Sequence, residues 1–210
     1  TCAVPLHAQP QPQLQPGQAA SPQAATPQAE PRIGAAPAWI TPLAIPAPNP
    51  ARRDRPIQTL LLNSQVRVEA DAETSYSEMA VLIQNAQGVQ GLGTIALPWR
   101  PDHSELTIHR VEIIRNGTPI DLLAGGRRFT VARRESNLAS AMLDGVLTAV
   151  MQAGGLAVGD TIHLVFSVRQ RPGALPLRAE NLYALPYGFP VRRLYARVLW
   201  PTGTTLQWRA

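Results

Sequence analysis

Alternating apolar and polar residues begin at Gln58 and recur in short runs, and this period of two restricts the possible fold more than any other feature. Successive side chains of a β-strand point to opposite faces, so such a run is typical of a strand with one buried face. The clearest run is Thr161–Arg171. Its inward residues are expected to be Ile162, Leu164, Phe166 and Val168, and its outward residues His163, Ser167 and Arg169.

Turn signals divide these runs into short strands. Asn116-Gly117 is the strongest signal, because both residues tolerate the positive φ that a type I′ hairpin turn requires. Asn116-Gly117-Thr118 also fits a glycosylation sequon, but the tight turn explains the pattern. Strands are predicted over residues 58–70, 74–84, 94–97, 106–115, 118–123, 127–132, 145–152, 161–171, 192–200 and 204–209. This spacing indicates an all-β chain folded as an antiparallel β-sandwich.

The segments between the strands are predicted to be irregular. Residues 87–93 are expected to be a loop, 136–143 a helical turn or a bulged crossover, and 172–190 a proline-rich loop. A parallel α/β sheet is disfavoured, because no helical stretch of crossover length separates the strands. Asp144-Gly145 and Gly159-Asp160 are interpreted as turn residues, in which the carboxylate accepts hydrogen bonds from the main chain.

Composition changes between residues 56 and 57. Of the 21 prolines, 13 lie in residues 1–56, where Pro, Gln and Ala repeat. Such a stretch buries too little apolar surface to offset its ordering entropy, so it is predicted to be a disordered tail. Within it, Trp39–Pro46 is either an arm that packs on the domain or part of the linker. Residues 57–210 are predicted to form the sandwich domain, truncated at its C-terminal end.

The first eight residues resemble the end of a signal peptide. Residues 1–8 directly precede the Pro/Gln stretch and place Ala8 at a cleavage position, although no charged region comes before them. No apolar run approaches the roughly 18–20 residues of a membrane helix, so no transmembrane segment is expected. These features predict a periplasmic or secreted bacterial protein.

The positive charge is carried by arginine alone. All 19 basic residues are Arg, and the formal net charge is +5. The Arg pairs are scattered along the chain, whereas a nucleic-acid-binding protein clusters its basic residues on one face. A nucleic-acid partner is therefore not expected.

The sequence contains no recognisable catalytic set. Cys2 is the only cysteine and precedes the predicted domain, which excludes an internal disulfide and a thiolate zinc site there. The best metal candidate is Asp102-His103 with Glu105, and His109 lies farther along the chain. A solvated polar loop explains these residues better, because their spacing matches no familiar zinc pattern. We therefore assign no catalytic residue, cofactor or metal ligand, and the chain is expected not to be an enzyme.

Most aromatic residues lie in or beside predicted strands. They are Tyr76, Trp99, Phe129, Phe166, Tyr183, Tyr187, Tyr195, Trp200 and Trp208. Large rings in strands are typical of core and inter-sheet contacts, so they are predicted to be core residues and not a sugar-stacking platform.

Several segments between Trp39 and Arg171 occur in an order that resembles a known family. They are Ala38–Pro42, Leu62–Gln65, Leu97–Pro101, Glu105–His109, Arg115–Gly117, Ile120–Leu123, Phe129–Glu135, Leu143–Gly145 and Val158–Asp160. The family is the β-rich domain of unknown function that precedes the transglutaminase-like core in secreted bacterial proteins. The resemblance implies an immunoglobulin-like sandwich followed by a separate domain with a Cys-His-Asp triad. No residue of this chain corresponds to that triad, so no catalytic residue carries over.

Three functional hypotheses follow. In the first, the chain is a non-catalytic N-terminal module of a larger transglutaminase-like envelope protein, and it packs against its own downstream domain or presents substrate to it. The alternative is a free-standing envelope module that binds cell-wall glycan or protein. The third is a metal-dependent hydrolase that uses His103 and Glu105.

Overall fold

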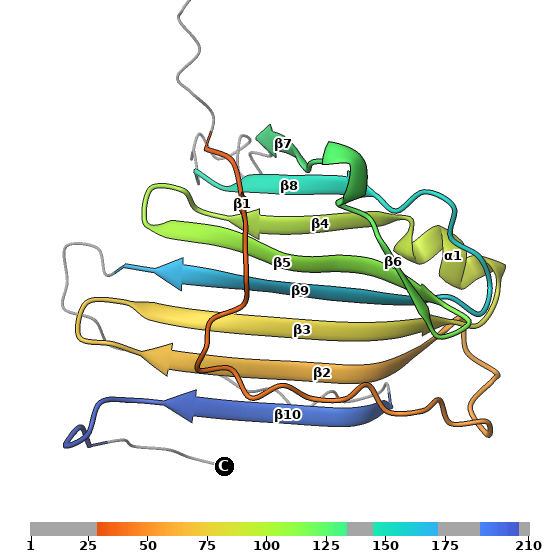
Figure 1. Ribbon diagram of the computed structural model, residues 1–210, viewed down its shortest axis with the longest axis horizontal. Coiled ribbons are helices and arrows are strands. Elements are labelled where there is room, and N and C mark those ends of the chain that lie inside the picture. The colour runs from red at the N-terminus through yellow and green to blue at the C-terminus, as the bar shows by residue number, and fades with distance from the viewer. Residues whose placement is uncertain (1–28, 134–144, 172–189, 206–210) are drawn as a thin grey trace, which may run out of the picture.

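The computed structural model describes residues 29–133, 145–171 and 190–205, which form two packed β-sheets (Figure 1). Sheet A comprises β1 (Arg32–Ile33), β2 (Ile57–Val68), β3 (Glu73–Ile83), β5 (Ser104–Arg115), β6 (Thr118–Asp121), β9 (Thr161–Gln170) and β10 (Val191–Leu199). Sheet B comprises β4 (Thr94–Trp99), β7 (Thr130–Arg133) and β8 (Leu147–Gln152). A short helix, α1 (Ala86–Leu92), precedes β4, and a single 3-10 turn (Ala124–Gly126) precedes β7.

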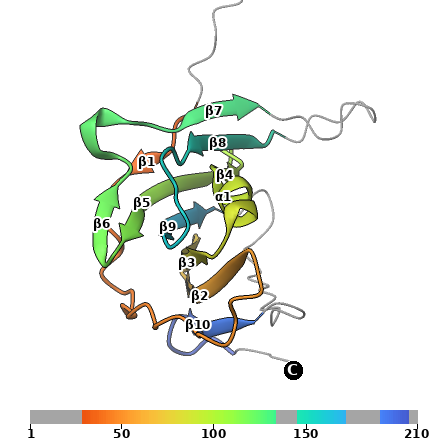
Figure 2. The same ribbon diagram turned by 90° about the vertical axis from the view of Figure 1, so that its right-hand side faces the viewer.

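The strands of sheet A follow the order β1-β5-β9-β3-β2-β10, with β6 paired to β5, and sheet B follows the order β4-β8-β7. The end-on view shows sheet B lying over the β5 and β9 part of sheet A (Figure 2). We call the side of sheet A that faces sheet B its inner face, and the opposite side its outer face. The two-sheet arrangement confirms the predicted all-β sandwich.

The main core lies between the two sheets. Alternate residues of β5 are buried there, including Ile108 and Val111, which have no exposed surface. Sheet B contributes Ile95, Leu97, Trp99, Leu147, Ala149 and Met151. In β9, Ile162 and Leu164 are buried and Phe166 and Val168 pack against the core, so the predicted inward face is confirmed.

The predicted hairpin turn at Asn116-Gly117 is confirmed. Both residues have positive φ, 50° and 79°, and the flanking Arg115 and Thr118 pair across β5 and β6. These dihedrals are those that a type I′ turn demands.

Residues 87–93 were predicted to be a loop, and the structure corrects this: most of them belong to α1. The Asn85 side chain accepts a hydrogen bond from the Gly88 amide at 3.1 Å, which caps the helix N-terminus. A Cβ atom at Gly88 would lie 2.2 Å from the Pro56 carbonyl oxygen, so glycine is required for close contact. Of the glycines that suggested a loop, Gly88 therefore serves packing instead.

Two strand pairs depart from the predicted antiparallel arrangement. β1 pairs with β5 and β10 pairs with β2 in parallel register. Both pairs lie at the margins of sheet A, and the central pairs β2-β3, β3-β9 and β5-β9 are antiparallel. Residue alternation reports which side of a strand is buried but carries no information on strand direction.

Residues 34–56, here called the arm, run across the outer face of sheet A (Figure 1). Leu43 and Ile45 of the arm pack against Leu60, Leu61 and Ala80 of the sheet. The disordered tail predicted for residues 1–56 is therefore corrected for residues 29–56, and Trp39–Pro46 belongs to a packed arm. The correction has a physical cause, because a few apolar residues in a Pro- and Ala-rich stretch suffice to bury it when a sheet face receives them.

Some predictions fall on other parts of the chain. Three predicted segments lie wholly or largely outside the described residues: residues 1–28, the crossover 136–143 and the loop 172–190. The same holds for most of the predicted strand 204–209 and for Asp144, Tyr183, Tyr187 and Trp208. No helix in the described ranges is long and apolar enough to cross a membrane.

Candidate functional site

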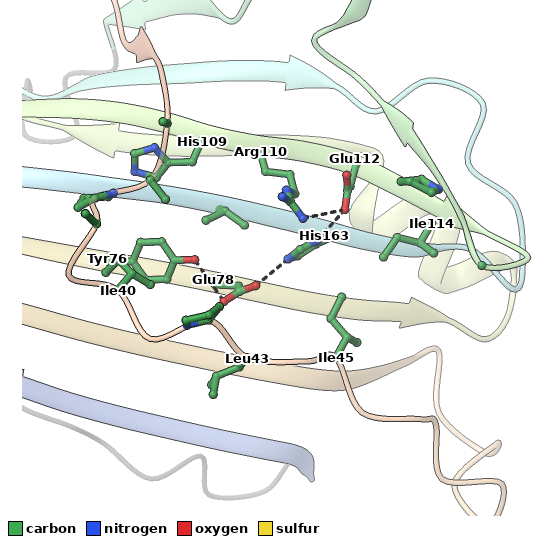
Figure 3. Close-up of a pocket in the computed structure, with 18 residues that line it drawn as sticks. Ile40, Leu43, Ile45, Tyr76, Glu78, His109, Arg110, Glu112, Ile114 and His163 are labelled. Carbon is green, nitrogen blue, oxygen red and sulfur yellow. Dashed lines mark hydrogen bonds and ion pairs between the residues drawn. The ribbon is translucent and has the colours of Figure 1, made fainter.

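Buried charged side chains gather on the outer face of sheet A, beneath the arm (Figure 3). They come from three adjacent central strands: Glu78 from β3, His163 from β9 and Glu112 from β5. Their side chains are only 8%, 5% and 14% exposed. Charged groups are rarely buried to this degree unless they are paired, so this cluster is the first candidate for a functional site.

His163 joins the two carboxylates. Its Nδ1 lies 2.8 Å from Glu112 Oε1, and its Nε2 lies 2.9 Å from Glu78 Oε1. Glu78 Oε2 also accepts hydrogen bonds from Asn63 Nδ2 at 2.8 Å and from the Tyr76 hydroxyl at 3.2 Å. We call Asn63, Tyr76, Glu78, Glu112 and His163 the buried network.

These contacts shift the pKa of the central groups. Burial alone would lower the pKa of His163, but hydrogen bonds to Glu78 and Glu112 outweigh it and raise that pKa. Burial alone would raise the pKa of Glu78, but hydrogen bonds from His163, Asn63 and Tyr76 lower it. The pKa of Tyr76 is raised by burial and by the neighbouring Glu78 carboxylate. These shifts favour an ionised Glu78, a protonated His163 and a neutral Tyr76.

This arrangement is better suited to holding β3, β9 and β5 together than to acting as a catalytic base. A general base needs a free lone pair within reach of a substrate proton, and both ring nitrogens of His163 are occupied by contacts to carboxylates. Arg110 lies 3.6 Å from Glu112 and adds a second positive charge. Two carboxylates are then balanced by two cations, which lowers the cost of burying them.

A cavity of about 810 Å³ lies between the arm and the buried network. Its arm side is apolar and includes Ile40, Leu43 and Ile45, while its sheet side carries Tyr76, Glu78, Arg110, Glu112 and His163 (Figure 3). An apolar wall with a few convergent polar groups is the usual composition of a binding pocket.

Asp102, His103 and Glu105 lie apart from this network, whereas the His109 ring stacks on Tyr76 with the ring centroids 6.1 Å apart. His103 contacts Asp102 at 2.9 Å, and Glu105 instead pairs with Arg32 and Arg171, each at 3.0 Å. His109 contacts the Gly34 carbonyl oxygen and the Ser167 hydroxyl, both at 2.9 Å. Within the described ranges, no group of three or more His, Cys, Asp and Glu residues could hold a metal ion.

His163 faces away from the inter-sheet core, as the alternation predicts, but it is only 4% exposed because the arm covers the outer face. Glu78 and Glu112 were not singled out from the sequence. A signal did exist, because Glu78 interrupts an otherwise apolar face of β3 between Tyr76 and Ala80. Such an interruption in a central strand indicates a buried pair and not a wet surface.

The aromatic residues that the structure describes lie mainly in the core. Tyr76, Trp99 and Phe129 are 4%, 5% and 8% exposed, which confirms that prediction for them. Trp200 is the exception at 44%. A glycan platform built on Trp99 has no support, because that ring is enclosed between the sheets.

Asp160 has a larger role than its predicted turn. Its carboxylate accepts a hydrogen bond from the Ala157 amide at 2.7 Å, as a turn residue should. It also receives two hydrogen bonds from Arg115, from Nε at 2.8 Å and from Nη2 at 2.7 Å. The hydrogen bond from Arg115 is the main reason that the pKa of Asp160 is lowered. The Arg115–Asp160 ion pair therefore links the turn before β9 to the end of β5.

A family model for a domain of unknown function with a solved structure, DUF3857, matches residues 70–210. The chain belongs to the DUF3857 family. The matched region includes Glu78, Glu112 and His163, whereas the arm and β2 precede it. No curated protein matches the chain.

One solved structure similar to this DUF3857 chain is that of a "putative protease" from Parabacteroides distasonis ATCC 8503. The two chains are 20% identical, with a TM-score of 0.62 over 71% of this chain. At this identity the likeness shows the fold alone. The match covers 30% of the Parabacteroides protein, so this chain spans less than a third of that protein's length.

Proposed function

We propose that this DUF3857 chain is a non-catalytic N-terminal module of a larger transglutaminase-like protein of the bacterial envelope, periplasmic or secreted. Its role is to pack against the downstream domain or to present substrate to it. One observation carries the proposal: among the described residues, sheet B leaves part of the inner face of sheet A as an apolar trough.

The trough exists because the two sheets differ in width. Sheet B has three strands, and in the described part of the chain it covers the β5 and β9 side of the inner face (Figure 2). The remaining side borders a cavity of about 760 Å³. Its apolar lining comprises Leu62, Met79, Leu92, Ile95, Leu97, Ile162, Leu164, Phe166 and Leu194. An apolar surface of this kind is typical of an interface with another protein domain.

The known relatives support a partner within the same polypeptide. In the Parabacteroides protein the matched fold is one part of a longer chain. The family resemblance noted above implies a downstream domain with a Cys-His-Asp triad, which is machinery for acyl transfer. The saturated hydrogen bonding of the buried network agrees with a module that leaves the chemistry to that domain.

The test compares two equally exposed leucine-sized side chains in the longer protein. Leu194 borders the trough and Ile120 lies on β6, and each is 41% exposed. We expect Leu194→Asp to reduce hydrogen-exchange protection around the trough and to loosen the downstream domain, while Ile120→Asp leaves both unchanged. Equal effects of the two substitutions, or a reading frame without a downstream domain, would refute the proposal.

A further inference from the structure

The arm is held through its main chain by glutamine side chains of β2. Gln65 Oε1 accepts a hydrogen bond from the Thr41 amide at 3.0 Å, and Gln65 Nε2 donates to the Thr41 carbonyl oxygen at 2.7 Å. Gln58 binds the amide and carbonyl of Asn49 in the same way, at 2.8 and 3.2 Å. Each side-chain amide thus pairs with a peptide group as a neighbouring strand would.

A β-bulge places both glutamines on the outer face. Gln58 and Gln65 are an odd number of residues apart, so in a regular strand they would point to opposite faces. The register of β2 against β3 shifts between Thr59 and Leu61, and the extra residue, Leu60, restores the alternation. A second bulge in β5, between Ile108 and Arg110, brings His109 to the same face. Bulges that re-aim side chains commonly mark functional surfaces.

Basic side chains also bind arm carbonyl groups. Arg197, Arg193 and Arg192 of β10 donate to the carbonyl oxygens of Trp39, Ala44 and Ala47, at 3.1, 3.1 and 3.2 Å. His109 contacts the Gly34 carbonyl oxygen at 2.9 Å. Contacts to peptide groups do not depend on the side chains that the bound segment carries.

Apart from the Thr41 hydroxyl, which accepts a hydrogen bond from Arg197 Nη1 at 2.7 Å, the side chains of the arm supply apolar contacts that leave space beside them. Leu43 and Ile45 pack on Leu60, Leu61 and Ala80, yet the cavity of about 810 Å³ remains beside them. The carboxylates that border this cavity, Glu78 and Glu112, are already balanced by His163 and Arg110. The surface therefore suits uncharged residues, including ones larger than those of the arm.

We propose that the outer face of sheet A is a binding site for an extended, apolar, proline-containing segment of a partner polypeptide, and that the arm occupies this site in cis. Proline favours the arrangement, because a preformed extended segment loses little entropy on binding. The inference goes beyond the packing role proposed above and does not depend on the trough.

The covalent link gives the arm an advantage over any free peptide. A short tether corresponds to an effective concentration in the mM range, so a peptide at micromolar concentration competes poorly with an intact arm. Loosening the arm should open the site. Leu43→Asp does this, because it places a charge against the apolar surface of Leu60 and Leu61.

The test measures binding of a fluorescently labelled synthetic peptide with the sequence of residues 34–50 to the full chain. We expect at least tenfold tighter binding to Leu43→Asp than to the unchanged protein. Adding Gln65→Ala, or N-methylating the peptide at Thr41, should reverse this gain at least tenfold, because each removes a main-chain clamp. Ile120→Ala, at an exposed residue of β6 that lines neither the cavity beneath the arm nor the trough, is the control and should leave peptide binding unchanged.

Three results would overturn the proposal. They are no binding to a Leu43→Asp protein that keeps its β-sheet circular dichroism, binding that is indifferent to Gln65, and a dimer in gel filtration that exchanges arms between two copies. If Leu43→Asp fails to fold, Thr41→Pro replaces it, since this change deletes the amide that Gln65 accepts from. Because the trough substitutions act on the opposite face, the two proposals can fail separately.

Discussion

On its inner face sheet A meets sheet B through aliphatic side chains, whereas on its outer face it meets a single extended segment across a row of charges. Both surfaces are buried, as shown by Ile108 at 0% exposure on one side and His163 at 4% on the other. The inner face is stabilised by removing apolar area from water. The outer face depends on exact partners for each charge, because a buried ion that loses its partner is costly.

The largest effect is expected from His163→Leu. The substitution removes the imidazole that bridges Glu78 and Glu112 and leaves the two carboxylates with one nearby cation, Arg110. We expect a loss of about 3–5 kcal/mol in the free energy of unfolding, measured by urea denaturation. Adding Glu112→Gln should recover part of the loss by removing one of these charges. A loss below about 1 kcal/mol would mean that water reaches the carboxylates.

The matching change on the inner face is Ile108→Ala. It removes a fully enclosed side chain from the core between the sheets and leaves a cavity. The expected loss is about 2–4 kcal/mol by the same measurement. This loss should not depend on pH between 5 and 9, since Ile108 contacts no titrating partner in the buried network. The loss caused by His163→Leu should depend on pH. Ile120→Ala is the exposed control and should cost less than about 0.5 kcal/mol.

A smaller effect is expected where the arm meets the sheet. Gln65→Ala removes the two hydrogen bonds to Thr41 and contacts to Asn63 and Arg197, all made by a side chain that is itself fully buried. The expected loss is about 1–3 kcal/mol. Hydrogen exchange should show faster exchange at the Thr41 amide and unchanged protection in sheet B. If hydrogen exchange in sheet B becomes faster by the same factor, the stability of the inner face depends on the arm, contrary to this prediction.

The smallest expected effect is that the contribution of the outer face to stability varies with pH, whereas the contribution of the inner face does not. The pKa of Glu78 lies below its usual 4.5, so its contribution is present above that pH and is lost as the pH falls through the lowered value. The pKa of His163 lies above its usual 6.5, so its contribution is complete below that pH and is lost as the pH rises through the raised value.

Stability should therefore be highest between these limits, and the change at alkaline pH should be modest because neutral His163 still donates one N–H. Urea midpoints of the protein and of His163→Leu, measured from pH 3 to pH 9, provide the check. The alkaline decline should disappear in the variant. Its persistence there would assign the decline to another group.

The inner face could be predicted closely from the sequence, and the outer face could not. Alternation located β9 and its core residues, and the Asn116-Gly117 pair located the hairpin, because both signals are local. The role of His163 depends on Glu78 and on an arm that lies far away in the sequence. Its partners are brought together by strand register, which a single run of residues does not encode.

The same limit explains the arm and helix α1. Proline and alanine content predicted a tail, but the contacts that hold residues 34–56 come from side chains of β2 and β10. Glycine content predicted a loop where Gly88 allows a helix to approach Pro56 closely. In both places local composition was overruled by a partner distant in the chain.

The course of the arm also has a mechanical consequence. Its first residues cross the strands of sheet A, and residues 41–49 then run lengthwise over β2 and β10 (Figure 1). Tension applied at the residue 29 end and directed away from the sheet would load the pairing of β1 with β5 first, and then the Gly34, Thr41 and Asn49 attachments in turn. Such peeling yields at far lower force than shearing a long parallel pair such as β2 and β10. A pull from that end would uncover the surface beneath while both sheets stay folded.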